Sequence, residues 1–272
     1  KIAEDAYRCF EPYRKDEGGL YARAARFVPE LCRFEVVHLL REIERRMPLY
    51  NSDHENVFST AQNALVAVHA EEYYREMIKG GPHSWNIRDR HMAETLDRLL
   101  QFHGEDAKVV VWAHNTHVGD ARATSMTNEG MLNIGELARL HYGDEQVVLV
   151  GFGSYKGQVI AGHKWGAAMQ AIDLPPAING SWEDILHKAG NEDKLLIMDD
   201  FTNNNELMEN HVGHRAVGVV YNPEYELYSN YVPTIVPLRY DAFIFLDKTM
   251  PLYPLHIVPA GNEMPETYPF GV

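Results

Sequence analysis

The chain has 272 residues, of which 45% are hydrophobic and 24% are charged, a composition typical of a folded globular protein with a sizeable core. Its formal net charge of −14 opposes binding to nucleic acid or to an anionic membrane, because both attract basic surfaces. No stretch approaches the roughly 20 apolar residues that a transmembrane helix requires. We therefore expect no nucleic acid and no membrane as partner, and the charge is compatible with an enzyme that acts on a small molecule.

Two cysteines, Cys9 and Cys32, show neither metal-ligand spacing nor a disulfide framework. They predict two structural thiols in a reducing cytoplasm, and nothing in the sequence predicts a cofactor. Lys1 is not a natural start, so we expect residues to precede it.

Residues 1–105 are typical of consecutive helices. The first spans Lys1–Phe10, the second runs through Leu20–Phe27, and a third follows Pro29 and ends at Met47-Pro48. A capping box, Ser52-Asp-His-Glu55, opens the next helix, which Gly80-Gly81-Pro82 stops. The last helix starts at Ser84 and carries an apolar stripe from Met92 to His103. Arg88 and Asp89 lie in or near its first turn, where an acid complements the helix dipole and the pair could also be a surface ion pair.

The character of the sequence changes after Gly104. Val109–Ala113 is an uncharged, β-branched run that predicts a strand buried on both faces. A helix over Asn133–His141 and a strand over Gln146–Phe152 follow, which together predict a right-handed βαβ unit with parallel strands.

The remainder predicts a small α+β region at about 153–240. The expected fold class is therefore α/β: an all-helical domain or insertion over 1–105, then an α/β core over 106–272 that contains this embedded region and a parallel sheet. The elements expected are strands at Tyr155–Ala161, Ala167–Ile172, Lys194–Met198, Ala216–Tyr221 and Asp241–Leu246, and a helix at Ser181–Ala189.

Polar residues follow the expected strand at 109–113, and ligands in open α/β sheets bind at the carboxyl ends of strands. His114 and His117 could act as general acid–base groups near neutral pH, and such proton transfer typically raises a reaction rate by about 10²–10⁴. They could also stabilise an oxyanion. Alternatively the two histidines bind a metal, with Asp120 as a third ligand, although this spacing is not typical of metal sites. A third interpretation is structural, with Asp120 and Arg122 paired across a turn in a binding protein.

Six motifs follow one another along the chain: Ser84-Trp-Asn-x-Arg-Asp-x-x-Met92, Trp112-Ala-His-Asn-x-His-x-Gly-Asp-Ala-Arg122, Asn133-x-Gly-x-Leu137, Gly151-Phe-Gly153, Ala216-Val-Gly-Val-Val-Tyr-x-Pro-Glu224 and Tyr240-Asp-Ala-Phe-Ile-Phe-Leu-Asp-Lys-Thr249. Together they resemble the erythromycin esterase family, in the family's order from about residue 50 to residue 249. The resemblance implies a metal-independent hydrolase in which a histidine activates water for attack on an ester, such as a macrolactone. It assigns His114 and His117 to the catalytic cleft, and we add Arg88, Asp89, Asp120 and Arg122 as candidate substrate-binding residues.

One motif of the family is not present in this sequence. The proposed general base of the family belongs to an N-terminal Gly-Glu-x-x-His motif, and neither Gly104-Glu105 nor Gly135-Glu136 has a histidine three residues on. The chain therefore resembles the C-terminal two-thirds of the family, and we expect these residues alone to be inactive. Because many relatives are associated with exopolysaccharides, a metal-dependent hydrolase and a non-catalytic small-molecule binding protein of polysaccharide biosynthesis remain alternatives.

Overall fold

A computed structural model describes residues 1–16, 19–28, 30–49, 53–77, 79–164, 167–201 and 205–252. The chain divides into two compact units. The helical unit comprises Lys1–Val110 with Glu129–Leu132, and the sheet unit comprises Val111–Asn128 with the chain from Asn133 onward.

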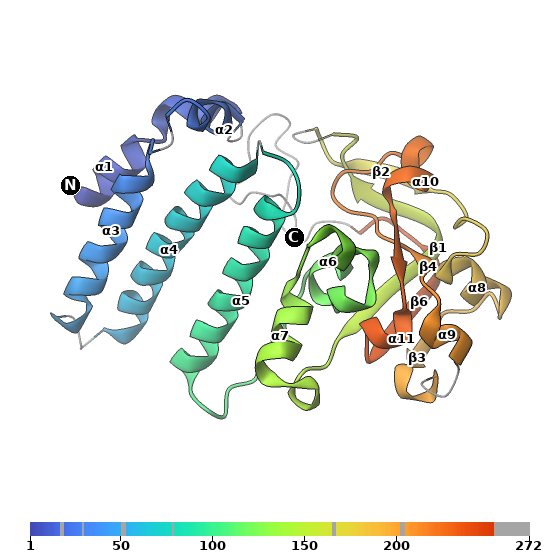
Figure 1. Cartoon of the computed structure of the whole chain (residues 1–272). Helices are drawn as coiled ribbons and strands as arrows, with labels where there is room; N and C mark the ends of the chain where they lie inside the picture. The colour runs from blue at the N-terminus through green and yellow to red at the C-terminus, as the bar shows by residue number, and fades with distance from the viewer. Residues whose placement is uncertain are drawn as a thin grey trace. The chain divides into compact units, whose positions relative to one another are not determined.

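The helical unit confirms the helices expected from the apolar periodicity. Within it α4 packs against both α3 and α5, as Figure 1 shows. Residues 129–132 join this unit because Trp85 Nε1 donates to Leu132 O at 2.7 Å and Asn86 Nδ2 donates to Gly130 O at 2.9 Å. Ser52 of the expected capping box lies outside the described residues. The helices are α1 (Ile2–Arg8), α2 (Gly19–Ala25), α3 (Arg33–Arg46), α4 (His54–Met77) and α5 (His83–His103).

Cys9 and Cys32 form a disulfide, with their Cα atoms 5.6 Å apart. The prediction of two free structural thiols is therefore wrong. The bond joins α1 to the start of α3 beneath Tyr21, whose hydroxyl accepts from Cys32 N at 3.2 Å. Disulfides persist mainly in oxidising compartments, so the two cysteines do not support the predicted reducing cytoplasm. Among the described helices, none is long and apolar enough to cross a membrane.

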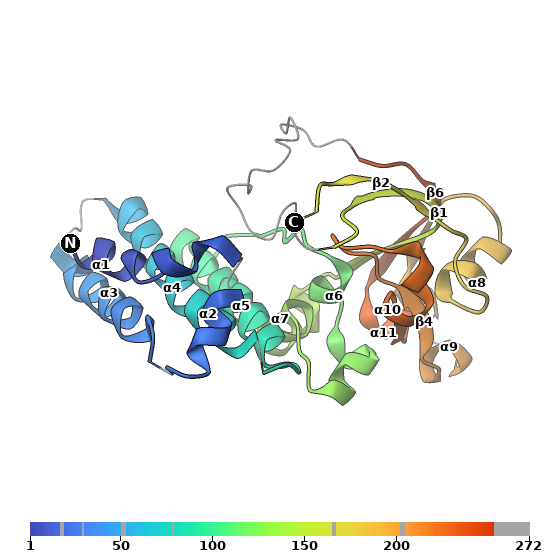
Figure 2. The ribbon, with the colours of Figure 1, turned by 90° about the horizontal axis from the view of Figure 1, so that it is seen from above.

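The sheet unit confirms the α/β class, with a mixed sheet. Its four-stranded sheet has the order β2-β1-β6-β3, in which β1 and β6 are parallel and the other two pairs are antiparallel. Figure 2 shows β1, β2 and β6 together, and α8 packs on β1 and β6. The strands are β1 (Val150–Ala161), β2 (Gln170–Leu174), β3 (Lys194–Ile197) and β6 (Ala242–Thr249), and β4 (Val212–Arg215) with β5 (Tyr231–Thr234) forms a separate antiparallel pair.

Short helices connect and cover these strands. The helix predicted over Ser181–Ala189 is confirmed as α8, and the Ser181 side chain accepts from Asp184 N at its start. The helix predicted over Asn133–His141 is confirmed as α7, which Asn133 caps through Glu136 N. The core beneath them contains Trp182, Tyr240 and Phe243, all at least 95% buried. The helices are α6 (Asn115–Val118), α7 (Ile134–Tyr142), α8 (Trp182–Lys188), α9 (Asn205–Glu209), α10 (Glu226–Ser229) and α11 (Val236–Arg239).

The buried strand predicted at 109–113 is wrong. The segment has no regular secondary structure, and Val110 and Trp112 are 91% and 80% exposed. A strand forms only when a neighbouring strand pairs with it, and no described strand pairs with this segment. The predicted βαβ unit fails with it, and the parallel pair is instead β1 with β6, far apart in sequence.

The strand predicted at 216–221 is also wrong. The pairing residues are Val212–Arg215, immediately before it, because these pair in register with Tyr231–Thr234. After Arg215 the chain leaves the pair, and only Val220 makes an isolated bridge, to Gly162. A β-branched run therefore does not by itself specify a strand.

Candidate functional site

The His114–Asp120 segment of the sheet unit forms a short helical turn, α6, between two extended residues. His114 caps this helix: its Nδ1 accepts from Thr116 N at 3.2 Å and lies 2.9 Å from Thr116 Oγ1. Because Nδ1 accepts, Nε2 carries the hydrogen and donates to Val217 O at 2.9 Å. Burial, followed by nearby positive charge, lowers the pKa of His114 from 6.5 to about 4, although the bond to Val217 opposes this. His114 is thus a neutral, fully hydrogen-bonded ring.

Asn115 fastens the turn to the first residues of β1. Its Nδ2 donates to Phe152 O at 2.5 Å, and its Oδ1 accepts from Phe152 N at 3.1 Å, as a paired strand residue would. The backbone carbonyl of Asn115 accepts from Arg239 Nη2 at 2.9 Å. Arg239 is fully buried, and its Nη1 donates to Thr234 Oγ1 at 3.0 Å. The turn is therefore bonded to both β1 and α11.

Helix α7 holds the other side of the turn. Asn133 Nδ2 donates to Thr116 O at 2.8 Å and to Gly119 O at 2.5 Å. A Cβ on Gly135 would lie 2.2 Å from Val118 O, so only glycine allows α7 to approach α6 this closely. A Cβ on Gly119 would likewise lie 2.5 Å from Arg239 Nε. Both glycines are required by close approach rather than by a left-handed backbone.

His117 lies on this turn and is half-buried. It is close enough to His114 for its charge to disfavour protonation of that ring. The side chains of His114, Asn115 and Asn133 and the carbonyl of Thr116 are all engaged in holding the turn. His117 is the other histidine of the predicted pair, and it remains the candidate for proton exchange.

Asp120 and Arg122 follow the turn and pair with each other. Arg122 Nε and Nη2 donate to Asp120 at 3.0 and 2.7 Å, and Arg139 Nη1 donates to the same carboxylate at 3.2 Å. Burial opposes ionisation of Asp120, but the hydrogen bonds from Arg122 and Arg139 outweigh it and lower the pKa of the carboxyl. The pairing across a turn agrees with the structural interpretation, and a substrate-binding role for the two residues stays a prediction.

Arg88 and Asp89 lie on α5 of the helical unit. The Arg88 guanidinium stacks over the Trp85 ring at 4.9 Å, and Asp89 is fully buried. The predicted site residues therefore come from both units: these two from one, and His114, His117, Asp120 and Arg122 from the other. Their shared role in substrate binding also stays a prediction.

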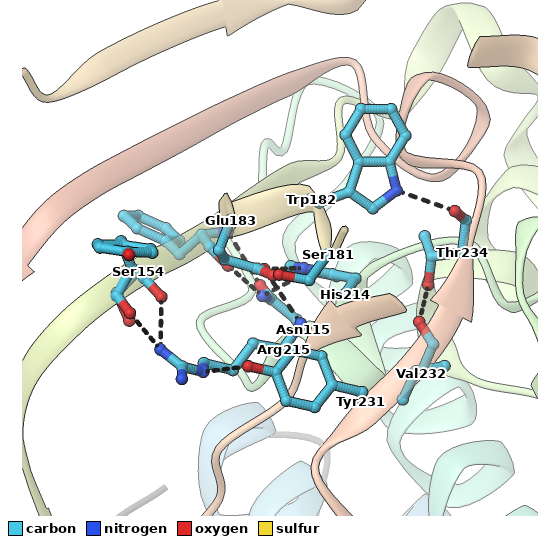
Figure 3. Close-up of polar contacts among 12 residues, drawn as sticks. Asn115, Ser154, Ser181, Trp182, Glu183, His214, Arg215, Tyr231, Val232 and Thr234 are labelled. Atoms are coloured by element: carbon cyan, nitrogen blue, oxygen red, sulfur yellow. Dashed lines mark hydrogen bonds and ion pairs between the residues drawn. The ribbon is translucent and has the colours of Figure 1, made fainter. Parts of the chain in front are cut away.

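A second group of polar side chains contacts α6 through Asn115, and its buried acid and histidine are not among the predicted site residues. His214 on β4 and Glu183 on α8 are both fully buried, and His214 Nδ1 lies 2.6 Å from Glu183 Oε1 (Figure 3). His214 Nε2 lies 3.2 Å from Tyr240 Oη and 3.4 Å from Asn115 Nδ2. Tyr240 belongs to the quoted family motif, but no spacing in the sequence points to His214 or Glu183. Among the described residues, no group of three or more histidines, cysteines and carboxylates is arranged to hold a metal.

A family model described as erythromycin esterase matches residues 1–249. A succinoglycan biosynthesis protein aligns with a TM-score of 0.68 at 13% identity, over 92% of this chain and 57% of that one. A Bacillus cereus protein aligns with a TM-score of 0.67 at 13% identity, over 96% and 65%.

The third similar structure is a mutant of the erythromycin esterase EreC in its open conformation. It aligns with a TM-score of 0.56 at 18% identity, over 80% of this chain and 52% of that one. These identities support the fold alone. The chain spans less than two thirds of the length of each of the three structures.

Proposed function

The chain belongs to the erythromycin esterase family, and from this premise we propose that it forms the histidine-bearing part of a hydrolase that cleaves an ester or lactone. The observation that carries the proposal is the α6 turn. Bonds to β1, α7 and α11 hold its backbone while it bears His117. Groups held in place before the reaction stabilise a developing charge without reorganisation.

In the proposed reaction, water attacks the acyl carbon, and the bond from that carbon to the alkoxy oxygen breaks. His117 donates a hydrogen bond to the developing oxyanion or a proton to the departing oxygen. His114 has both ring nitrogens engaged, so we assign it to positioning the turn rather than to proton transfer. The products are a carboxylic acid and an alcohol, or a hydroxy acid where the substrate is a lactone.

The substrate we propose is a small-molecule ester or lactone, with a macrolide such as erythromycin as the first to test. The complete natural protein is incubated with erythromycin and, separately, with p-nitrophenyl butyrate. Ring opening adds one water to erythromycin, which mass spectrometry detects. Ring-opened product supports the macrolide proposal. Activity on the simple ester alone retains the hydrolase and rejects the macrolide, and no turnover of either contradicts both.

The role of His117 is tested by its alanine variant in the same assays. We expect His117→Ala to lower kcat by about a hundredfold or more, since acid–base groups contribute about 10²–10⁴. His141→Ala is the matched control, because His141 is an exposed histidine on α7 in the same unit. An unchanged kcat in the folded His117→Ala variant would contradict the proposal.

A non-catalytic binding protein is the second candidate, and the alignment with a succinoglycan biosynthesis protein favours it. For a binding protein, His117→Ala leaves any ester turnover untouched. The metal-dependent alternative is tested by elemental analysis, in which near-stoichiometric zinc in the purified protein would replace the metal-independent proposal. A cytoplasmic location also stays a proposal, to be checked by cell fractionation.

A further inference from the structure

Glu183 and His214 form a buried polar pair, and neither residue belongs to a motif quoted from the sequence. Both side chains are fully buried in the sheet unit, one on α8 and the other on β4. Glu183 Oε1 also accepts from Arg215 N at 3.0 Å, whereas Glu183 Oε2 is buried without a hydrogen-bond partner among the described residues. Such a carboxylate depends strongly on its donors, and His214 is the nearer of the two.

The hydrogen-bond roles of His214 follow from its neighbours. Because a carboxylate oxygen accepts, His214 Nδ1 carries the hydrogen of this bond, and Nε2 is assigned as the acceptor of the ring. Tyr240 supplies one donor to Nε2, and burial raises the pKa of Tyr240 to about 12, so that its hydroxyl stays protonated. The second donor is Asn115 Nδ2 at 3.4 Å.

Asn115 connects this pair to the α6 turn. An amide can be inverted with little change in shape, and inversion would place its oxygen against Phe152 O and its nitrogen against Phe152 N. His214 Nε2 favours the same orientation of the Asn115 amide as Phe152 does. In that orientation Asn115 Nδ2 faces both Phe152 O and His214 Nε2. The buried pair therefore supports one orientation of the side chain that begins the helix bearing His117.

We propose that Glu183 and His214 are positioning residues, which through the Asn115 amide set the α6 turn that presents His117. The inference rests on the proposed function for its effect on turnover, but the geometry makes a separate structural claim. Buried polar groups are seldom more stabilising than apolar residues of the same size, and their best-attested benefit is a unique arrangement. Here the arrangement is that of Asn115.

Two substitutions of His214 separate the ends of its ring. In His214→Asn the side-chain nitrogen falls near the position of Nδ1, so Glu183 keeps a donor and Asn115 loses its acceptor. In His214→Gln the amide falls near Nε2, so Asn115 keeps an acceptor and Glu183 loses its donor. We expect His214→Asn to lower kcat by about tenfold to a hundredfold with KM little changed, because small misplacements of reacting groups have effects of this size. We expect His214→Gln to lower the unfolding midpoint more and kcat less.

A purely structural role makes the opposite prediction. If the pair only stabilised the fold, losses of kcat would follow losses of stability, and His214→Gln would be worse in both; that result would overturn the proposal. Tyr231→Phe is the matched control, because it removes buried bonds to Arg215 Nε and Ile178 N without touching Asn115. It is expected to lower stability without a selective loss of kcat.

Amide hydrogen exchange tests the inference independently of activity. We expect faster exchange over 114–119 and at Phe152 in His214→Asn but not in His214→Gln, even if the wild-type protein hydrolyses no ester. If His214→Asn does not fold, Asn115→Asp tests the contact of Asn115 with His214 and Phe152. The substitution replaces the nitrogen that donates to Phe152 O with a carboxylate oxygen. Unchanged exchange over 114–119 in folded His214→Asn would overturn the positioning role, whereas absent turnover with changed exchange would reject only the proposed function.

Discussion

The two units differ in how far their charged side chains are buried and in how far apart in sequence their partners lie. In the helical unit most ion pairs are local and exposed, such as Arg45 with Glu42 and Lys79 with Glu76. In the sheet unit Arg215, Arg239 and Glu183 are at least 96% buried and bond to distant backbone and side chains. Exposed pairs contribute little, whereas buried ones depend on complete partners. We therefore expect the stability of the sheet unit to depend more on its charged residues than that of the helical unit does.

Removing the most extensively bonded charge of the sheet unit should have the largest effect. Arg215 pairs with Glu226 at 2.5 Å and donates to the carbonyls of Ser154, Tyr155 and Pro175. Arg215→Met leaves Glu226 buried without its cation, and we expect the free energy of unfolding to fall by about 3–5 kcal/mol. Urea denaturation monitored by circular dichroism measures this, and a change within error would show that the cluster is not a stability determinant.

The helical unit should instead depend on its disulfide. Cys9 and Cys32 are separated by 23 residues, and closing a loop of this size stabilises a fold by roughly 3 kcal/mol through the entropy of the unfolded chain. We expect Cys9→Ala with Cys32→Ala to lower the thermal transition of the helical unit and to leave that of the sheet unit in place. Differential scanning calorimetry with and without reductant checks this. A reductant-insensitive wild type would contradict the disulfide.

Acid should weaken the sheet unit through His114. Its pKa is lowered from 6.5 to about 4, so between these values the unfolded chain binds a proton that the folded one does not. The stability is complete above about pH 6.5 and falls as the pH decreases towards 4, by roughly 2–3 kcal/mol at 1.36 kcal/mol per pKa unit. His114→Asn keeps a cap for Thr116 N but cannot titrate. Urea midpoints between pH 4 and 7 should therefore fall less steeply in the variant, and equal slopes would contradict the buried neutral ring.

The smallest effect is expected for the exposed pair of the helical unit. Arg45 donates to Glu42 at 2.8 Å on the surface of α3. Arg45→Met is expected to leave the urea midpoint unchanged within error, because solvent screens the pair. It is also the matched control for Arg215→Met, and a loss comparable with that variant would remove the contrast between the units.

The contrast between local and long-range contacts also explains which parts of the fold the sequence predicts. Helices α3, α4 and α5 are predictable because their apolar periodicity is local, and so are the helices that begin after Ser181 and Asn133. The 109–113 segment was not, because a β-branched run specifies a strand only when another strand pairs with it. The disulfide escaped prediction because two cysteines carry no spacing pattern.

The residues of the candidate site also differ in whether the sequence identifies them. His114 and His117 were identified because they follow one another in a single motif. Glu183 and His214 were not, because they come from α8 and β4 and meet only through the pairing of β4 with β5 and the packing of α8. The local motif therefore points to the two histidines, whereas the α6 turn that carries them and the long-range contacts that hold it are seen only in the structure.

The most direct test is the amide exchange of the α6 turn itself. A four-residue helix has no stability of its own in water, so its protection must come from the bonds made by Asn115, Asn133 and Arg239. We predict that the Val118 and Gly119 amides, which donate to the carbonyls of residues 114 and 115, exchange as slowly as the β1–β6 pair. Exchange as fast as in an unstructured loop would contradict a turn held in place for catalysis.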